Sequence, residues 1–431
     1  MNTIKYPKQE TWSEILARPA AGTESLGAKV TEILEDVRLN GDSAVRSRTE
    51  EFDRVFLESF LVTDEEIAAA EENVSAELRR AMELAKSNIE KFHAAQTETP
   101  KKIETAPGVF CWRSSRGIES VGLYVPGGTA PLFSTVLMLA VPAKLAGCRE
   151  IVLCSPPDKN GKVNDAILCA AKLCGVTKIF KIGGVQAIGA MAFGTETVPK
   201  VFKIFGPGNR FVTAAKQIVS QFGVAIDMPA GPSEVAVFAD ESAVPEFVAA
   251  DLLSQAEHGE DSQVLLVSSS EEVIKRTISE IEKQLTELPR REIAEMALKN
   301  SKAILVEDEE TAFKLLNEYA AEHLILAVED AGGIPGKIIN AGSVFIGNYS
   351  CESAGDYASG TNHTLPTNGY AKAFSGVSLD SFVKKITFQE LTAEGIKSIG
   401  PAIETMAQAE GLEAHKNAIS VRLRRIRGGE E

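Results

Sequence analysis

The chain has 431 residues, of which 44% are hydrophobic and 24% are charged, a balance typical of a globular protein rather than of a disordered one. At roughly 100–200 residues per domain, this length predicts two to four domains. With 45 Lys and Arg against 60 Asp and Glu, the net charge is −15. Nucleic acid is therefore a poor partner, because its phosphates would be repelled.

Nothing in the sequence predicts export or a membrane span. No apolar run approaches the roughly 18 residues that cross a bilayer, and the first eight residues, MNTIKYPK, lack the apolar core of a signal peptide. The six cysteines form no CxxC pair and most lie in apolar stretches, which predicts buried free thiols in a reducing compartment. We therefore expect a cytoplasmic protein.

The beginning of the chain has a helical pattern. Residues 1–20 predict a short helical arm, because Thr11 and Glu14 have the spacing of a capping box. From Glu24 to about Gln96 the sequence is charged and helical, with a long amphipathic segment that starts at Asp64.

Strands and helices alternate from residue 121 onwards. Apolar, β-branched runs predict strands at 121–125, 151–154, 178–182, 201–205, 224–226, 235–238, 263–267, 303–306, 323–328 and 343–346. Helical segments separate them at 132–146, 165–174, 185–193, 210–221, 244–256, 271–285 and 309–319. This alternation predicts an α/β fold with two parallel-sheet units. From about Phe382 the pattern is helical again.

Three glycine-rich turns each follow a predicted strand and precede a predicted helix. They lie at 126–129, 183–186 and 206–209. Glycine lets a backbone approach a ligand closely, and helix N-termini favour anions. A nucleotide site is one interpretation, but the GxGxxG fingerprint is absent, so plain turn chemistry remains the other.

Histidine usage points to a metal or acid–base site. There are five histidines, and four lie in polar, carboxylate-rich segments: His258, His323, His363 and His415. Imidazole and carboxylate ligands suit Zn²⁺ or another first-row divalent ion. The pattern leaves both Gln255 and Glu257 open as ligands and favours Glu257, since glutamine is an unusual zinc ligand. For Glu322 and His323, a capping pair between helix and strand is the alternative to a catalytic pair.

Several of these strings together resemble the histidinol dehydrogenase family. The matching strings are VGLYVPGGTAPLFSTV at 121–136, IFGPGN at 204–209, DMPAGPSE at 227–234, LSQAEHG at 253–259, EH at 322–323, SAGDYASGTNH at 353–363 and AHKN at 414–417. The resemblance runs from about residue 20 to the end.

The resemblance implies two Rossmann-like parallel-sheet units, one inserted in the other, with an N-terminal arm and a C-terminal helical tail. By analogy, residues 21–122 and 237–376 form a larger α/β domain. Residues 123–236 form an incomplete Rossmann-like domain for NAD. Residues 1–20 form the arm, and residues 377–431 form a helical dimerisation domain.

The resemblance also implies a reaction and a set of site residues. The family oxidises L-histidinol through L-histidinal to L-histidine, the last steps of histidine biosynthesis, with two NAD⁺ and one zinc ion per subunit. Its zinc ligands match Gln255, His258, Asp356 and His415, which overrules the preference for Glu257. Its catalytic residues match Glu322 and His323, and its NAD contacts match Tyr124, Gln186 and Asn209. Its substrate contacts match Ser233, Gln255, His258, His323, Asp356, His363, Glu410 and His415.

In such an enzyme a neutral histidine takes the hydroxyl proton while hydride leaves carbon. His323 is expected to be this base, and Glu322 to activate the water of the second oxidation. His415 and Glu410 are expected to come from the partner subunit, so the active form is a homodimer. Two other readings remain open: the same scaffold acting on another small alcohol, such as a sulfonated propanediol, or a zinc hydrolase without nicotinamide.

Overall fold

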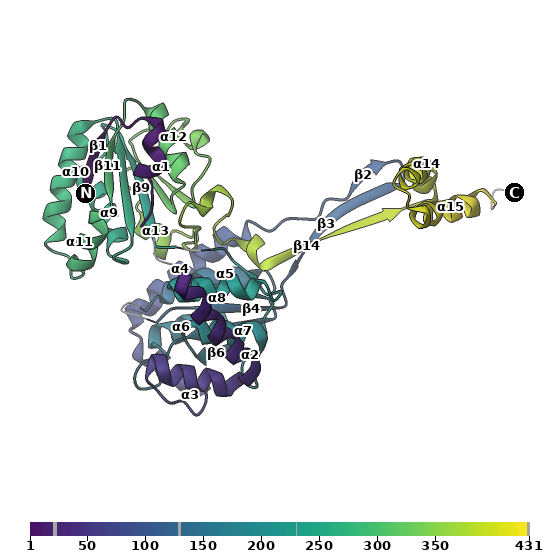
Figure 1. Cartoon of the computed structure of the whole chain (residues 1–431), viewed down its shortest axis with the longest axis horizontal. Helices are drawn as coiled ribbons and strands as arrows, with labels where there is room; N and C mark the ends of the chain where they lie inside the picture. Colours follow the sequence, from purple (N-terminus) through teal and green to yellow (C-terminus); the bar gives the residue numbers. More distant parts are fainter. Residues whose placement is uncertain (20–23, 128–130, 230, 429–431) are drawn as a thin grey trace. The chain divides into compact units, whose positions relative to one another are not determined.

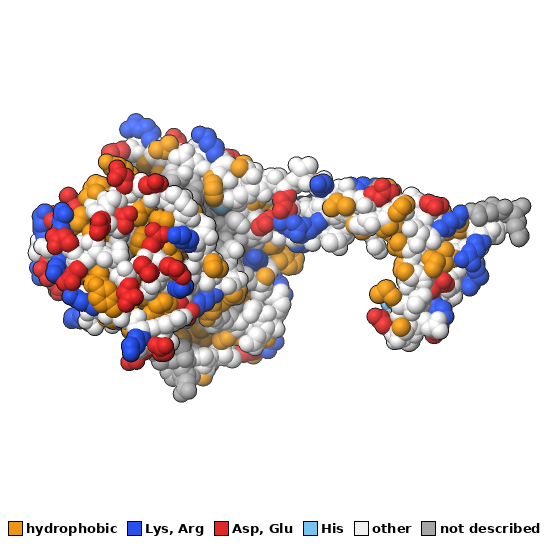
Figure 2. Space-filling view, turned by 90° about the horizontal axis from the view of Figure 1, so that it is seen from above, with side chains coloured by type: hydrophobic (Ala, Val, Ile, Leu, Met, Phe, Trp, Pro, Cys, Tyr) orange, Lys and Arg blue, Asp and Glu red, His pale blue; other side chains and the backbone are white. Residues whose placement is uncertain are grey.

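The computed structural model describes residues 1–19, 24–127, 131–229 and 231–428. The chain divides into two compact units (Figure 1). Unit one comprises Met1–Ala95 and Ile118–Phe382, and unit two comprises Gln96–Gly117 and Val383–Glu431. On the face shown in Figure 2, acidic and basic side chains are interspersed rather than gathered by sign.

The first sheet of unit one has five parallel strands in the order β6-β5-β4-β7-β8. Their bounds are Ser120–Tyr124 for β4, Glu150–Ser155 for β5, Lys178–Lys181 for β6, Lys203–Phe205 for β7 and Ala225–Ile226 for β8. Every residue of the central strand β4 is buried, as expected for a parallel sheet that is covered on both faces.

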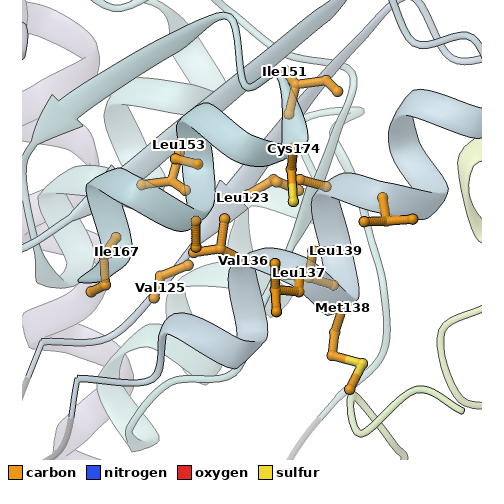
Figure 3. Packing of buried hydrophobic residues seen from close by; sticks show 14 of the residues in the cluster. Leu123, Val125, Val136, Leu137, Met138, Leu139, Ile151, Leu153, Ile167 and Cys174 are labelled. Carbon is orange, nitrogen blue, oxygen red and sulfur yellow. The ribbon is translucent and has the colours of Figure 1, made fainter. Parts of the chain in front are cut away.

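Alternate residues of these strands point to opposite layers of helices. Leu123 and Leu153 pack in one cluster with α5 (Phe133–Leu145) and α6 (Asp165–Cys174), as Figure 3 shows. Tyr124 and its neighbours on the other face pack against α2 (Glu24–Asp53), α7 (Gly184–Phe193) and α8 (Arg210–Ser220). Each fully buried aliphatic side chain contributes about 1.5–3 kcal/mol to folding.

The second sheet of unit one has six parallel strands in the order β1-β11-β10-β9-β12-β13. Their bounds are Asn2–Lys5 for β1, Glu234–Ala239 for β9, Gln263–Ser268 for β10, Lys302–Leu305 for β11, His323–Ala327 for β12 and Ser343–Ile346 for β13. One face packs on α9 (Pro245–Ala256), α10 (Glu271–Leu285) and α11 (Arg291–Lys299), and the other on α1 (Trp12–Ile15) and α12 (Glu309–Tyr319). The predicted α/β class is confirmed. The predicted insertion is confirmed as well, because the five-stranded sheet lies in the sequence between β1 and β9 of the six-stranded sheet.

The N-terminal arm is only partly helical. Residues Asn2–Lys5 form β1, which pairs with β11 at the sheet edge, and the helix is confined to Trp12–Ile15. The capping box predicted at Thr11 is wrong, because the Thr11 side chain makes no capping hydrogen bond. A four-residue edge strand has too short a pattern to be read from periodicity.

Helices α2, α3 (Asp64–Asn73) and α4 (Ala76–Ala94) pack on the five-stranded sheet. Side chains of α2 share a cluster with Tyr124, and those of α3 and α4 share one with Leu123. The family resemblance implied that these helices belong to the same domain as the six-stranded sheet. In the structure they pack on the five-stranded sheet. The domain boundaries themselves stay a prediction.

Unit two contains a three-stranded antiparallel sheet and two helices. The sheet order is β14-β3-β2, with bounds Val383–Leu391, Val109–Gly117 and Ile103–Ala106. The helices are α14 (Ala393–Ala409) and α15 (Glu413–Arg427). The tail is therefore helical as predicted, but its first segment is a strand, whose partner β3 lies some 270 residues earlier in the sequence. In the described ranges, no helix is long and apolar enough to cross a membrane.

Candidate active site

A cleft of about 1510 Å³ in unit one collects five of the predicted site residues. It is lined by Asn209 from the five-stranded side and by Ser233, His258, Glu322 and His363 from the other. Ser233 and Glu322 each stand immediately before a strand, β9 and β12. The side chains expected to carry chemistry thus lie at the amino ends of the six-stranded sheet, whereas the glycine turns lie at the carboxyl ends of the five-stranded one.

Three side chains offer ligand atoms to a common point. Donor atoms of His258, Glu352 and Asp356 all lie within 4.8 Å of one another. Glu352 and Asp356 are four residues apart on α13 (Glu352–Tyr357), so they share one helix face. Glu257, which the pattern alone favoured as a ligand, is not in this group.

The amide of Gln255 is directed at the same point. Gln255 is buried in the last turn of α9. Its oxygen faces the Glu352 carboxylate, and its Nε2 lies 3.5 Å from Oε2 of Glu322. With oxygen and nitrogen exchanged, the nitrogen would donate to Glu352 Oε2 at 3.1 Å and the oxygen would accept from the backbone N–H of Glu234 at 2.9 Å. In this orientation both ends of the buried amide are hydrogen-bonded, so the Gln255 side chain is held beside Glu352.

One buried carboxylate oxygen without a hydrogen-bond partner could also serve as a metal ligand. Oδ1 of Asp356 is buried without a hydrogen-bond partner, and such an atom is costly unless an ion or another group satisfies it. Imidazole, carboxylate and amide oxygen are a donor set suited to Zn²⁺ and similar ions. The residues present therefore fit a divalent cation at this point.

His323 and Glu322 lie next to this cluster. Nε2 of His323 is 3.5 Å from Oδ1 of Asp356, and its Nδ1 is 3.3 Å from the carbonyl oxygen of Glu234. Because a carbonyl only accepts, the neutral ring carries its proton on Nδ1, and Nε2 is left as the basic nitrogen. Oε2 of Glu322 accepts from the backbone N–H of Glu234 at 2.9 Å.

The electrostatics of the cluster favour added positive charge. Burial raises the pKa of Glu322 to about 7 and that of Glu352 well above its ordinary value. Burial lowers the pKa of His323, but the carboxylates of Glu322, Glu352 and Asp356 outweigh burial and raise it to about 10. Burial also raises the pKa of Asp356, which the nearby imidazoles nevertheless hold below its usual range.

His363 is fixed by two contacts at the cleft wall. Its Nδ1 lies 3.0 Å from the carbonyl oxygen of Asp356, and its Nε2 lies 3.2 Å from Oγ1 of Thr135. Burial lowers the pKa of His363, which favours a neutral ring at physiological pH. A neutral imidazole suits recognition of a polar ligand.

The three predicted NAD contacts lie at the carboxyl ends of β4, β6 and β7. The Tyr124 hydroxyl accepts from the backbone N–H of Gly184 at 3.1 Å. Both amide atoms of Gln186 are buried without a partner. The Asn209 side chain caps α8, accepting from the backbone N–H groups of Phe211 and Val212, and its contact with NAD stays a prediction. Residues 128–129 of the first glycine turn lie outside the described residues.

Glu410 and His415 belong to unit two. Both are exposed, Glu410 as the C-cap of α14 and His415 in the first turn of α15. Their part in the site stays a prediction.

The sequence analysis missed three buried or half-buried acids, Glu234, Glu352 and Asp251. Burial raises the pKa of Asp251 to about 7. Glu234 could have been found from the sequence, because a carboxylate directly before the apolar run VAVFA indicates a buried acid.

Comparison with known proteins places the chain in a family. The sequence pattern of the family Histidinol dehydrogenase matches residues 16–423. The chain belongs to the histidinol dehydrogenase family. It is 63% identical over 427 residues to the histidinol dehydrogenase of Bacteroides thetaiotaomicron, which covers 99% of this chain and 100% of that protein. It is 52% identical over 421 residues to that of Escherichia coli K12, with 97% and 96% covered.

A solved histidinol dehydrogenase has the same fold. The crystal structure of the enzyme from Elizabethkingia anophelis is 57% identical and superposes with a TM-score of 0.98, covering 99% of each chain. Membership of the histidinol dehydrogenase family at this identity makes the chain an oxidoreductase of histidine biosynthesis. The resemblance found in the sequence is confirmed.

Proposed function

We propose that this protein is a zinc-dependent enzyme that oxidises L-histidinol to L-histidine through L-histidinal, reducing two NAD⁺. The observation that carries the proposal is the position of His323, 3.5 Å from Asp356 and therefore beside a group of metal-type ligands. Full-length similarity to histidinol dehydrogenases supports the substrate. The cytoplasmic location stays a prediction.

The proposed metal site uses Gln255, His258 and Asp356, with His415 supplied by the partner subunit. A zinc ion held by these residues would supply a fixed point for the nitrogen donors of the substrate and would offset the carboxylates around His323. The partial negative charge at the C-terminus of α9, which ends at Ala256, adds to the attraction for a cation.

His323 is the proposed base for the alcohol proton. The Glu234 carbonyl holds the ring with Nε2 free, and this nitrogen takes the hydroxyl proton as hydride leaves the carbon for the nicotinamide. Asp356, on the Nε2 side, stabilises the charge that the ring gains. The same ring can then act again in the second oxidation.

Glu322 is the proposed activator of water in the second oxidation. An aldehyde must be hydrated before a second hydride can leave, and a buried carboxylate with a pKa of about 7 is matched to taking a proton from water near neutral pH. The backbone N–H of Glu234 holds this carboxylate in place. Both oxidations can thus take place in one cleft.

NAD is proposed to bind at the glycine turns, in contact with Tyr124, Gln186 and Asn209. The unpartnered buried amide of Gln186 supports this, because a ligand would satisfy it. The substrate is proposed to contact Ser233 and His363 in the same cleft. Gln255, His258, His323 and Asp356 are proposed to complete the substrate contacts, together with Glu410 of the partner subunit and His415 of the partner subunit.

A homodimer is proposed because unit two exposes many apolar side chains. These are Ile103, Ile386, Met406, Leu412 and Val421, each at least 39% exposed. Orange side chains are visible on the surface of this unit, at the right of Figure 2. Burial against a second subunit would remove this surface from water. Glu410 and His415 lie on the same pair of helices.

The decisive assay is NADH formation from L-histidinol, with and without a chelator. We expect two NADH per histidinol, loss of activity with the chelator and recovery with zinc. Absence of NADH from the zinc-loaded enzyme, with oxidation of sulfopropanediol or another alcohol instead, would favour the other-alcohol reading. Failure to bind NAD⁺ in calorimetry would favour the hydrolase.

A further inference from the structure

A buried ion pair lies behind the catalytic pair. Arg18, from the segment after α1, donates through Nε to Oε1 of Glu234 at 2.5 Å and through Nη2 to Oε2 at 2.8 Å. The Glu234 side chain is 2% exposed and that of Arg18 18%. This is the bidentate geometry in which arginine fixes both the position and the orientation of a carboxylate.

Each member of the pair is anchored a second time. Nη2 of Arg18 also donates to the carbonyl of Tyr319 at 2.7 Å, and the guanidinium lies 4.2 Å from the centre of the Tyr319 ring. Oε1 of Glu234 also accepts from the backbone N–H of Asn368 at 2.7 Å. The pair therefore ties the arm, the end of α12 and the cleft wall at Asn368 to the first residue of β9.

The backbone of that same residue touches both proposed catalytic groups. Its N–H donates to Oε2 of Glu322, and its carbonyl faces Nδ1 of His323. A shift of the peptide groups at Glu234 would thus break the hydrogen bond to the Glu322 carboxylate and remove the acceptor that keeps the His323 proton on Nδ1. The Glu234 carboxylate, held by Arg18 and by the backbone N–H of Asn368, adds a side-chain anchor to these peptide groups.

We infer that Arg18 and Glu234 are positioning residues, which hold the β9 start so that its N–H orients Glu322 and its carbonyl keeps Nε2 of His323 free. The inference rests on the proposed roles of Glu322 and His323. A displacement of about 1 Å in a catalytic group can cost on the order of 100-fold in rate. The arm, far from the reacting atoms in sequence, would thus set the rate of both oxidations.

Arg18→Ala tests the inference, with Arg48→Ala as a matched control. Arg48 is 19% exposed, like Arg18, and pairs with Glu32, Asp36 and Glu51 on α2, away from Glu234. We expect Arg18→Ala to lower kcat about 10- to 100-fold from either histidinol or histidinal, with little change in KM. Arg48→Ala should keep the wild-type kcat. Millimolar guanidinium should restore part of the kcat of Arg18→Ala and leave that of Arg48→Ala unchanged.

Arg18→Lys keeps the positive charge but cannot bind both oxygens of Glu234 in the bidentate geometry. This variant also tests the inference if Arg18→Ala does not fold. We expect Arg18→Lys to fold and to have a lowered kcat that is intermediate between wild type and Arg18→Ala. Glu234→Gln should lower kcat about as much as Arg18→Ala does, and guanidinium should not restore it. Wild-type kcat in folded Arg18→Lys and Arg18→Ala, or a loss confined to thermal stability, would overturn the inference. A wild-type enzyme inactive on histidinol would instead refute the proposed function.

Discussion

Nε2 of His323 lies 3.5 Å from Oδ1 of Asp356, and neither atom has a hydrogen-bond partner. Both buried atoms face the proposed site, so a bound ligand would supply the partners that they lack. In the proposed function Asp356 would help to hold the metal ion, and Nε2 of His323 would take the proton of the substrate hydroxyl. The same carboxylates that raise the pKa of His323 would be neutralised in part by that cation, which returns the ring to its neutral, basic form.

His323→Asn should separate metal binding from proton transfer. We expect turnover to fall about 10²–10⁴-fold, the usual worth of a general base, with zinc content unchanged because Asp356 and His258 remain. Metal analysis and steady-state kinetics on the same sample measure both. Near-normal turnover would rule out His323 as the base.

Metal removal should lower stability, and Asp356→Asn should abolish that effect. Zinc at 100 times its dissociation constant stabilises the folded state by about 2.7 kcal/mol, so a chelator should lower the melting temperature of the wild type. Asp356→Asn, which loses a proposed ligand, should melt at one temperature with and without zinc. A zinc-independent melting temperature in the wild type would contradict the proposed site.

Glu322→Gln should stop the reaction after the first oxidation. The variant keeps an oxygen for the N–H of Glu234 but loses the base, so hydration of the aldehyde should slow by about 10²–10⁴-fold. The yield should fall from two NADH per histidinol towards one, with histidinal detectable by a carbonyl reagent. Two NADH per histidinol at the wild-type rate would exclude the assigned role.

Lys216→Met should destabilise the fold strongly. Lys216 forms an ion pair with Asp227 and donates to the Gly206 carbonyl at 2.8 Å, and both side chains are at most 4% exposed. Losing one partner leaves a buried charge unpaired, which costs about 3–5 kcal/mol. Denaturant unfolding measures the loss. The control is Lys178→Met, whose exposed pair with Glu150 is worth about 0–1 kcal/mol.

Asp53→Asn should stabilise the protein relative to wild type by an amount that grows from about pH 4 to pH 6 and stays constant above it. Burial raises the pKa of Asp53 from 3.8 to about 6, and its Oδ2 has no hydrogen-bond partner. The folded state therefore holds the proton more tightly than the unfolded state, so the stability due to Asp53 is complete below about pH 4 and is lost as pH rises through 6. Melting curves from pH 4 to 8 should show a gap between variant and wild type that opens as pH rises. Glu50→Gln, on the exposed face of α2, should show none.

Much of the fold could be predicted from local pattern. The predicted helix at 244–256 is α9, Pro245–Ala256, and the predicted strand at 121–125 is β4, Ser120–Tyr124, because buried parallel strands and their covering helices have long apolar signatures. The edge strand β1 and the antiparallel strands of unit two were missed. Their residues are half exposed and gain their partners from distant segments.

The sequence by itself determined the family, the parallel α/β architecture and the glycine turns, since these depend on residue order and on apolar periodicity over short distances. Only the tertiary structure decided which polar groups meet. Arg18 and Glu234 are 216 residues apart, Glu352 joins His258 through the packing of α13 beside α9, and the Glu234 backbone selects the tautomer of His323. Contacts of this kind arise when separate elements pack around a common core, and periodicity within one element carries no record of them.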